Sequence, residues 1–253
     1  MKNLILTFLY YLSFFTLFAQ SKSTAVDITY GAEQRVSKRY TLSDIIGYDE
    51  TGIYTLMLKA SWSYKLSISH YDNKMHHTRT VEIDLDHIKY PKRRFHSIIK
   101  MKDNFYLFST YNNKETRKNI LLVQSINKTT LTLNNDIKKI ASIDYSHASK
   151  RNSGNFDFSV SNDSSKLLVY YNPPYDKREK ESFGFHVFDQ YMNQIWSKNV
   201  TLPYQEALFV IERYKVGNKG RVYLLGTLFQ EKIKFKRKGM PNYKYIILSY
   251  DAN

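Results

Sequence analysis

The sequence contains no cysteine. The chain therefore has no disulfide bond, no thiolate zinc site and no cysteine nucleophile, and no lipid can be attached through an N-terminal cysteine. Catalytic signatures are also missing: there is no Gly-x-Ser-x-Gly, no phosphate-binding glycine loop and no His-Glu-x-x-His. None of the strong catalytic motifs is thus present.

The composition favours a folded, β-rich chain. Apolar residues make up 42% of the 253 residues and aromatic residues 15%, including 22 tyrosines and 15 phenylalanines. Such side chains need burial, which argues against disorder. Aromatic rings also fit the pleated, half-buried surface of a strand, and no convincing amphipathic helix follows the N-terminal segment. The length allows one large or two small domains, and all-β folds of this size often form one unit.

The N-terminal segment is typical of an export signal. Lys2 supplies a positive charge, Leu4 to Phe18 form an apolar run, and Ala19 offers a small residue for cleavage. The run is shorter than the roughly 20 residues of a membrane-spanning helix, so we expect residues 1–19 to be cleaved and no transmembrane span to remain. Leu17 stands where a small residue is expected, two positions before Ala19. An uncleaved membrane anchor is therefore the alternative. Export without cysteine indicates a bacterial envelope, with a periplasmic, outer-surface or secreted protein.

Internal repetition is the most informative feature of the chain. Four segments share one order: an apolar strand, a tight polar turn, a second strand, a variable loop, a third strand and another tight turn. The first turns lie near Asp49, Asp103, Asp163 and Asn218. The second turns have their Asx residue at positions 72, 127, 189 and 251. Asp, Asn and Gly recur there because tight turns need residues that accept positive φ or bond their own backbone.

This repetition predicts an all-β fold of antiparallel four-stranded units, like the blades of a β-propeller. The repeats are about 41–90, 91–150, 151–204 and 205–253. We expect the fourth strands at Thr80–Ile83, Thr130–Leu133 and Gln194–Val200, and none is visible in the last unit. The ring is therefore incomplete, or residues 20–40 supply a closing strand from Val26 to Tyr40.

The chain resembles exported bacterial β-propeller repeat proteins. The resemblance lies in the N-terminal signal, in Ile28-Thr29-Tyr30-Gly31, in Ile45-Ile46-Gly47-Tyr48-Asp49 leading to Gly52, and in the recurrent Tyr-Asp and Phe-Asp turns. It covers most of the chain beyond the signal and concerns architecture. The Gly-His and Trp-Asp pairs of WD repeats and the double glycines of kelch repeats are absent, so the resemblance implies no catalytic residue.

The formal net charge of +15 predicts affinity for anions. In a blade, the tight turns lie at one end, and the long loops and the crossovers between blades lie at the other. Most basic clusters fall in the long loops and crossovers, among which we place Lys138 and Lys139. We therefore expect one basic face, formed by Lys92, Arg93, Arg94, Lys118, Arg178, Lys234 and Lys236. The alternative is that these are solubilising loops.

Other residues suggest chemistry less specifically. The serines of Ser161–Ser165 lie at a turn, and the turn aspartates are explained by their turns. His76, His77 and His87 lie near Asp84 and Asp86, but nothing fixes three ligands on one face. We expect no catalytic residue, no metal and no cofactor.

The sequence thus predicts an exported, non-catalytic binding or scaffold protein. Its partner would be an anionic polysaccharide, a lipid headgroup or an envelope protein. Nucleic acid is disfavoured, because export separates the protein from most of it and no recognition motif is present. The alternatives are a glycan-active hydrolase with a carboxylate pair in its loops, and a structural piece that needs a partner chain to complete its sheet.

Overall fold

The computed structural model describes residues 30, 33, 40–59, 65–174, 179–230 and 241–252. These residues form fifteen β-strands and one short 3₁₀ helix, η2 (Lys150–Asn152), without an α-helix. The predicted all-β class is therefore confirmed. No helix among the described residues is long and apolar enough to cross a membrane. The predicted signal peptide, residues 1–19, lies outside the described residues.

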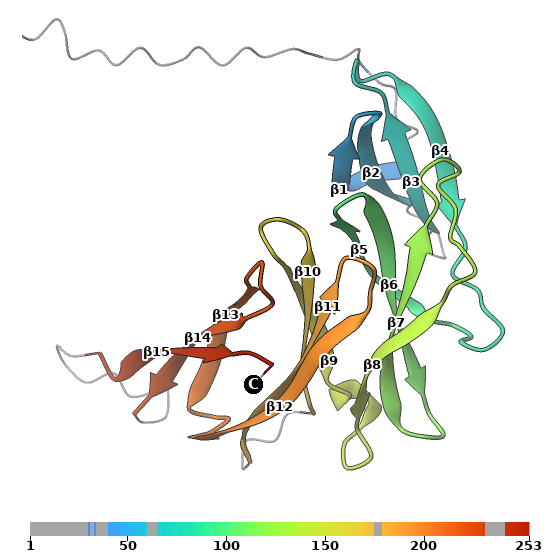
Figure 1. Cartoon of the computed structure of the whole chain (residues 1–253). Helices are drawn as coiled ribbons and strands as arrows, with labels where there is room; N and C mark the ends of the chain where they lie inside the picture. The colour runs from blue at the N-terminus through green and yellow to red at the C-terminus, as the bar shows by residue number, and fades with distance from the viewer. Residues whose placement is uncertain are drawn as a thin grey trace, which may run out of the picture. The chain divides into compact units, whose positions relative to one another are not determined.

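The strands form four antiparallel sheets, and within each sheet they pair in chain order (Figure 1). The strands are β1 (Tyr40–Asp49), β2 (Gly52–Lys59), β3 (Lys65–Tyr71) and β4 (His77–Ile83) in the first sheet; β5 (Arg94–Met101), β6 (Asn104–Asn113), β7 (Lys118–Ile126) and β8 (Lys138–Asp144) in the second; β9 (Asn155–Val160), β10 (Lys166–Asn172), β11 (Lys180–Asp189) and β12 (Gln194–Gln205) in the third; and β13 (Phe209–Val216), β14 (Val222–Phe229) and β15 (Tyr243–Tyr250) in the fourth. All of them lie within Gln34–Asn253, one of the two units into which the chain divides.

The tight turns form because their Asx side chains replace backbone acceptors. Asp49 Oδ1 accepts the N–H of Thr51 at 2.9 Å in the β1–β2 turn. In the β11–β12 turn, Asp189 Oδ1 accepts the N–H groups of Tyr191 and Asn193 at 2.8 and 2.9 Å. These bonds satisfy turn N–H groups that the strands cannot pair. The turns predicted near Asp49, Asp103, Asp163 and Asn218 are all present.

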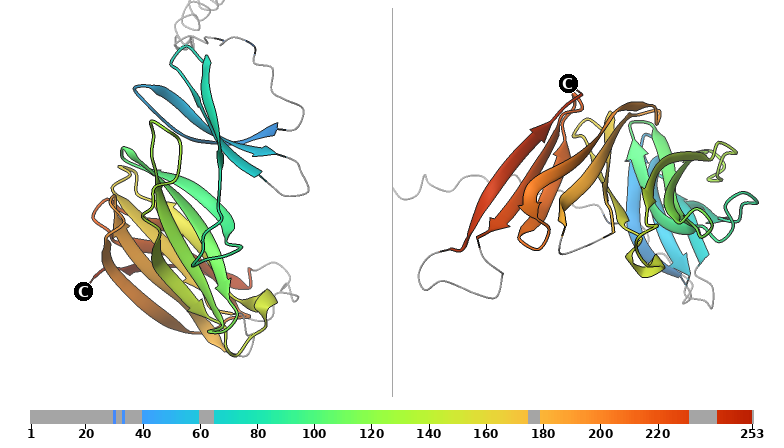
Figure 2. Two further views of the ribbon diagram at one scale, coloured as in Figure 1. Left: turned by 90° about the vertical axis from the view of Figure 1, so that its right-hand side faces the viewer. Right: turned by 90° about the horizontal axis from the view of Figure 1, so that it is seen from below.

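Successive sheets pack face to face through three hydrophobic clusters, and Figure 2 shows the sheets following one another. The alternation of side chains along a strand explains how a middle sheet contacts two neighbours. In β6, Leu107 packs into the cluster with the first sheet, and Phe108 packs into the cluster with the third. In β10, Val169 faces the second sheet and Tyr170 faces the fourth. Each middle sheet is therefore apolar on both faces.

The fourth strand of the second sheet differs from the prediction. It is β8, and Thr130–Leu133 instead forms a loop in which Leu133 makes a single bridge to Ile126. The cause lies in Leu131, which has a φ of 61° and is only 2% exposed, packed into the core between the first two sheets. An apolar side chain that looked like part of a strand thus anchors a loop.

The other two predicted fourth strands are present as β4 and β12, and the fourth sheet has three strands. Among the described residues, no strand pairing and no core cluster joins the fourth sheet to the first. The described sheets thus form an open series. Of the predicted closing strand, Val26 to Tyr40, only Tyr30, Glu33 and Tyr40 are described, and Tyr40 begins β1.

Candidate functional site

Some of the predicted basic residues meet in a groove at the long-loop end of the second sheet, which we call the basic groove. Its volume is about 660 Å³. It is lined by Pro91, Lys92, Arg94, Thr110, Tyr111, Asn112, Asn113, Lys114, Glu115, Asn119 and Ser153. Lys92 lies in the crossover from the first sheet, Arg94 begins β5, and Lys114 lies in the β6–β7 hairpin. The fold therefore brings these two segments together in one groove.

The register between β5 and β6 explains why the crossover and the β6–β7 hairpin lie close together. Arg94 at the start of β5 pairs with Thr110 near the end of β6, three residues before the hairpin begins at Asn113. The crossover is held against β6 by aromatic contact, since the rings of Tyr90 and Tyr111 lie 5.5 Å apart. In the hairpin, Asn113 Oδ1 accepts the N–H of Thr116 at 3.0 Å. The groove is thus built on a packed sheet end.

The groove combines positive charge with amide and hydroxyl groups. Lys92, Arg94 and Lys114 supply three cations against the single carboxylate of Glu115, and all four side chains are exposed. The amides are oriented by the protein: Asn112 Oδ1 accepts the hydroxyl of Tyr145 at 2.5 Å. Asn119 Nδ2 likewise donates to Gly154 O at 3.3 Å. The lining can therefore attract anions and also form hydrogen bonds with hydroxylated molecules.

Arg93, which we expected on the basic face, is only 6% exposed. Its Nε donates to Leu85 O at 2.6 Å, and its Nη1 donates to Ser109 Oγ at 3.4 Å. Burial lowers the pKa of this guanidinium. Arg93 thus fastens the crossover to β6 and does not present its charge at the surface.

The remaining predicted residues have different positions. Lys118 is half-buried at the start of β7, at the same end of the sheet, but it does not line the groove. Arg178, Lys234 and Lys236 lie outside the described residues. Lys138 and Lys139 are not in a crossover, because they begin β8, and Lys138 Nζ donates to Met192 O at 3.0 Å. Convergence of the whole predicted face stays a prediction.

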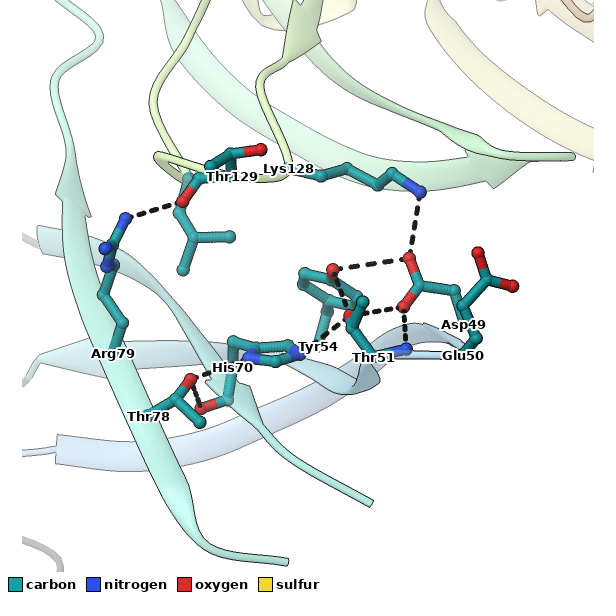
Figure 3. A pocket seen from close by; sticks show the side chains of 10 residues that line it. Asp49, Glu50, Thr51, Tyr54, His70, Thr78, Arg79, Lys128 and Thr129 are labelled. Carbon is teal, nitrogen blue, oxygen red and sulfur yellow. Dashed lines mark hydrogen bonds and ion pairs between the residues drawn. The ribbon is translucent and has the colours of Figure 1, made fainter.

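A second hollow lies at the tight-turn end, between the first two sheets, and we call it the turn cleft (Figure 3). Its volume is about 380 Å³. It is lined by Asp49, Glu50, Thr51, Tyr54, His70, Thr78, Arg79, Lys128, Thr129 and Leu131. This site could not be recognised from the sequence, because its residues lie in four separate segments and no local pattern connects them.

Asp49 is the centre of the hydrogen bonds in the turn cleft. Its carboxylate accepts from the Thr51 hydroxyl at 2.6 Å, from Lys128 Nζ at 2.9 Å and from the Tyr54 hydroxyl at 3.3 Å (Figure 3). Burial by itself would raise the pKa of Asp49, but the bonds from Thr51 and Lys128 more than offset it and hold the pKa well below its usual range. The carboxylate is therefore ionised and fully engaged.

A third hollow, of about 680 Å³, lies at the tight-turn end of the last two sheets. There Trp196 Nε1 donates to Gly220 O at 3.0 Å and fixes the β13–β14 turn. Arg221 Nη2 lies 2.7 Å from Asp251 Oδ2 in an exposed ion pair. The Trp196 hydrogen bond and the Arg221–Asp251 ion pair thus hold the β13–β14 turn in place.

Other candidates for catalysis have structural partners. Ser161 Oγ donates to Asp163 Oδ1 at 2.7 Å inside its turn. Among the described residues, no three His, Cys, Asp or Glu side chains form a group that could hold a metal ion. Glu181 is 7% exposed, and burial, together with the negative charge of Glu206, raises its pKa to about 7. Glu181 lines none of the three hollows described above.

No protein-family model matches this sequence, and neither does any curated protein. Solved structures do match in fold. The β-propeller domain of the Trilobed protease from Pyrococcus furiosus, described as having an open velcro topology, is 15% identical with a TM-score of 0.45, and the match covers 86% of this chain and 56% of that one. The chain thus spans just over half the length of that domain.

Two further matches are glycan-active enzymes. An endo-arabinase from Bacteroides thetaiotaomicron is 15% identical, with 83% and 74% of the two chains covered and a TM-score of 0.38. An α-L-arabinanase from Penicillium chrysogenum is 13% identical, with 85% and 63% covered and a TM-score of 0.42. At these identities the likeness concerns the fold alone. The repeated antiparallel sheets of this chain are those of a β-propeller-like protein whose described blades do not close into a ring.

Proposed function

We propose that this protein is a non-catalytic binding protein that holds an anionic polysaccharide in the basic groove. The supporting observation is the meeting of Lys92, Arg94 and Lys114 in one groove that contains a single opposing carboxylate, Glu115. Each exposed cation contributes on the order of 1 kcal/mol near an anionic surface, so binding depends on several cations acting together.

The groove lining favours a polysaccharide over a lipid headgroup or a protein. Asn112, Asn113, Asn119 and the hydroxyls of Thr110 and Tyr111 accompany the cations. These groups both donate and accept hydrogen bonds, as sugar hydroxyls do. An acidic sugar chain would use the charges and the amides at once, whereas a headgroup would use mainly the charges.

The groove chemistry does not favour hydrolysis. Most glycosidases need two carboxyl groups flanking the scissile bond, one as acid and one as base or nucleophile. Glu115 is the single carboxylate among the residues that line the groove. The groove therefore has the donors for holding a glycan but lacks the pair for cleaving it.

An extracytoplasmic location is part of this proposal. The apolar run from Leu4 to Phe18 with Ala19 supports export of the chain. Export would bring the groove to envelope or matrix polysaccharides. N-terminal sequencing of the secreted form should begin at Gln20, and recovery of the intact chain in the inner membrane would contradict cleavage.

Titration with polygalacturonate tests the binding proposal. The variant Lys92→Glu/Arg94→Glu/Lys114→Glu should lose at least tenfold in affinity at about 50 mM salt, and wild-type binding should weaken steeply as salt rises. The matched control reverses three exposed lysines in the tight turns, Lys74→Glu/Lys102→Glu/Lys219→Glu, and removes the same charge from the chain. Equal losses in the two variants would show that net charge, and not the groove, binds the polymer.

A further inference from the structure

Five polar side chains of the turn cleft, Asp49, Thr51, Tyr54, His70 and Thr78, form one connected set of hydrogen bonds. The Thr51 hydroxyl has one hydrogen, and the 2.6 Å contact gives it to Asp49. His70 Nε2, 3.2 Å from Thr51 Oγ1, must then be the donor in that contact. His70 Nδ1 lies 2.7 Å from Thr78 Oγ1, and the Thr78 hydroxyl donates to His70 O at 3.0 Å. Both ring nitrogens of His70 therefore contact threonine hydroxyls, and His70 positions Thr51 and Thr78.

Two other residues of the turn cleft, Lys128 and Arg79, have more N–H groups than their protein contacts use. Lys128 has three N–H groups, and its contact with Asp49 uses one. Arg79 has five N–H groups, and its Nη1 donates to Thr129 O at 2.6 Å. Arg79 comes from β4 of the first sheet, and Lys128 comes from the β7–β8 loop of the second (Figure 3). Two anchored cations thus line one cleft from two sheets.

From this surplus of donors we propose that the turn cleft binds the carboxylate of a small hydroxylated acid, such as a single uronic acid residue. A carboxylate accepts bonds only and offers about four acceptor sites, which complements Arg79 and Lys128. The exposed Glu50 and Thr129 at the cleft can pair with the hydroxyls of such a molecule. Because Lys128 is paired with Asp49, Arg79 supplies most of the electrostatic attraction, and the remaining N–H groups of Lys128 add hydrogen bonds.

The size of the turn cleft limits the ligand. Its volume of about 380 Å³ lies at the small end of the roughly 300–1,000 Å³ of typical ligand sites. The cleft is also bounded by two contacts between sheets, Lys128 with Asp49 and Arg79 with Thr129. It therefore suits one sugar-sized unit, and its binding is independent of the polymer binding proposed for the basic groove.

Calorimetric titration of the full chain with sodium glucuronate tests this inference, with glucose as the neutral comparison. Wild-type protein should bind glucuronate and bind glucose at least tenfold more weakly. Arg79→Met should weaken glucuronate binding at least tenfold, since a charge-assisted bidentate contact is lost. Glu50→Gln should strengthen it about two- to fivefold, because a nearby negative charge is removed. The matched control is Lys65→Met, a cation of the same sheet that does not line the cleft.

Two results would overturn the inference: equal binding of glucose and glucuronate by wild type, or unchanged glucuronate binding in Arg79→Met. A thermal melt of Arg79→Met shows whether the variant is folded, and if it is not, Arg79→Lys replaces it and should keep part of the affinity. The basic-groove variant Lys92→Glu/Arg94→Glu/Lys114→Glu should bind glucuronate as wild type does. If instead it alone loses glucuronate, the acid binds in the groove and the inference fails while the proposed function stands.

Discussion

Lys128 Nζ lies 2.9 Å from Asp49 Oδ2, although the two residues are 79 positions apart and belong to different sheets. The Asp49 side chain is 9% exposed, so its charge is largely removed from water. The ammonium and the hydroxyls of Thr51 and Tyr54 replace the lost hydration. This pair therefore fixes the tight-turn ends of the first two sheets to each other.

Asp49→Asn should lower the free energy of unfolding by about 2 kcal/mol at pH 7, because a buried, charge-assisted set of hydrogen bonds is weakened. The folded pKa of Asp49 is depressed, so its stabilisation is present above the ordinary pKa of aspartate and is lost as the pH falls further. The difference from wild type should thus shrink below about pH 4. Urea denaturation across pH measures it, with the exposed Asp44→Asn as control, and a constant difference at all pH values would contradict this assignment.

The adjacent residues Arg93 and Arg94 should respond oppositely to substitution. Arg93→Ala should cost about 2–3 kcal/mol of stability, since it leaves Leu85 O without its donor and removes buried side-chain stem. Arg94→Ala should change stability by less than about 0.5 kcal/mol and weaken polygalacturonate binding. Chemical denaturation and titration of both variants check this, and a stability loss confined to Arg94→Ala would refute it.

The turns could be predicted from the sequence because the hydrogen bonds that form them join residues close together in the chain. Asp49 and Asp189 bond N–H groups only two to four residues further along the chain, so residue type and spacing are enough to recognise them. The order of strands follows directly, since tight turns join neighbouring antiparallel strands. Of the basic face expected from this topology, Lys92 and Arg94 line the basic groove, and the rest of that face stays a prediction.

The remaining features depend on contacts that sequence spacing does not show. Arg93 is basic like Arg94, and only its distant partner Ser109 and the carbonyl of Leu85 make it a buried residue. Leu131 looks like a strand residue, but it fills space between two sheets. The turn cleft joins Arg79 to Thr129 across 50 positions, and nothing in either segment indicates the other.

Glu181→Gln should stabilise the protein at pH 8 by up to about 3 kcal/mol and change little at pH 5. The folded pKa of Glu181 is raised from 4.5 to about 7, so the protonated form is favoured in the folded state. The contribution of protonated Glu181 to the free energy of unfolding is therefore complete below pH 4.5 and is lost as the pH rises through 7. Urea denaturation at both pH values measures the effect, with the exposed neighbour Glu179→Gln as control. An equal gain at pH 5 and pH 8 would show that ionisation of Glu181 is not the cause.

Lysine acetylation with and without polygalacturonate, quantified by mass spectrometry, tests whether the polymer binds in the basic groove. We expect the polymer to protect Lys92 and Lys114 in the basic groove and to leave Lys74, Lys102 and Lys219 in the tight turns as reactive as before. Protection of the tight-turn lysines, or equal protection of all exposed lysines, would contradict binding in the groove.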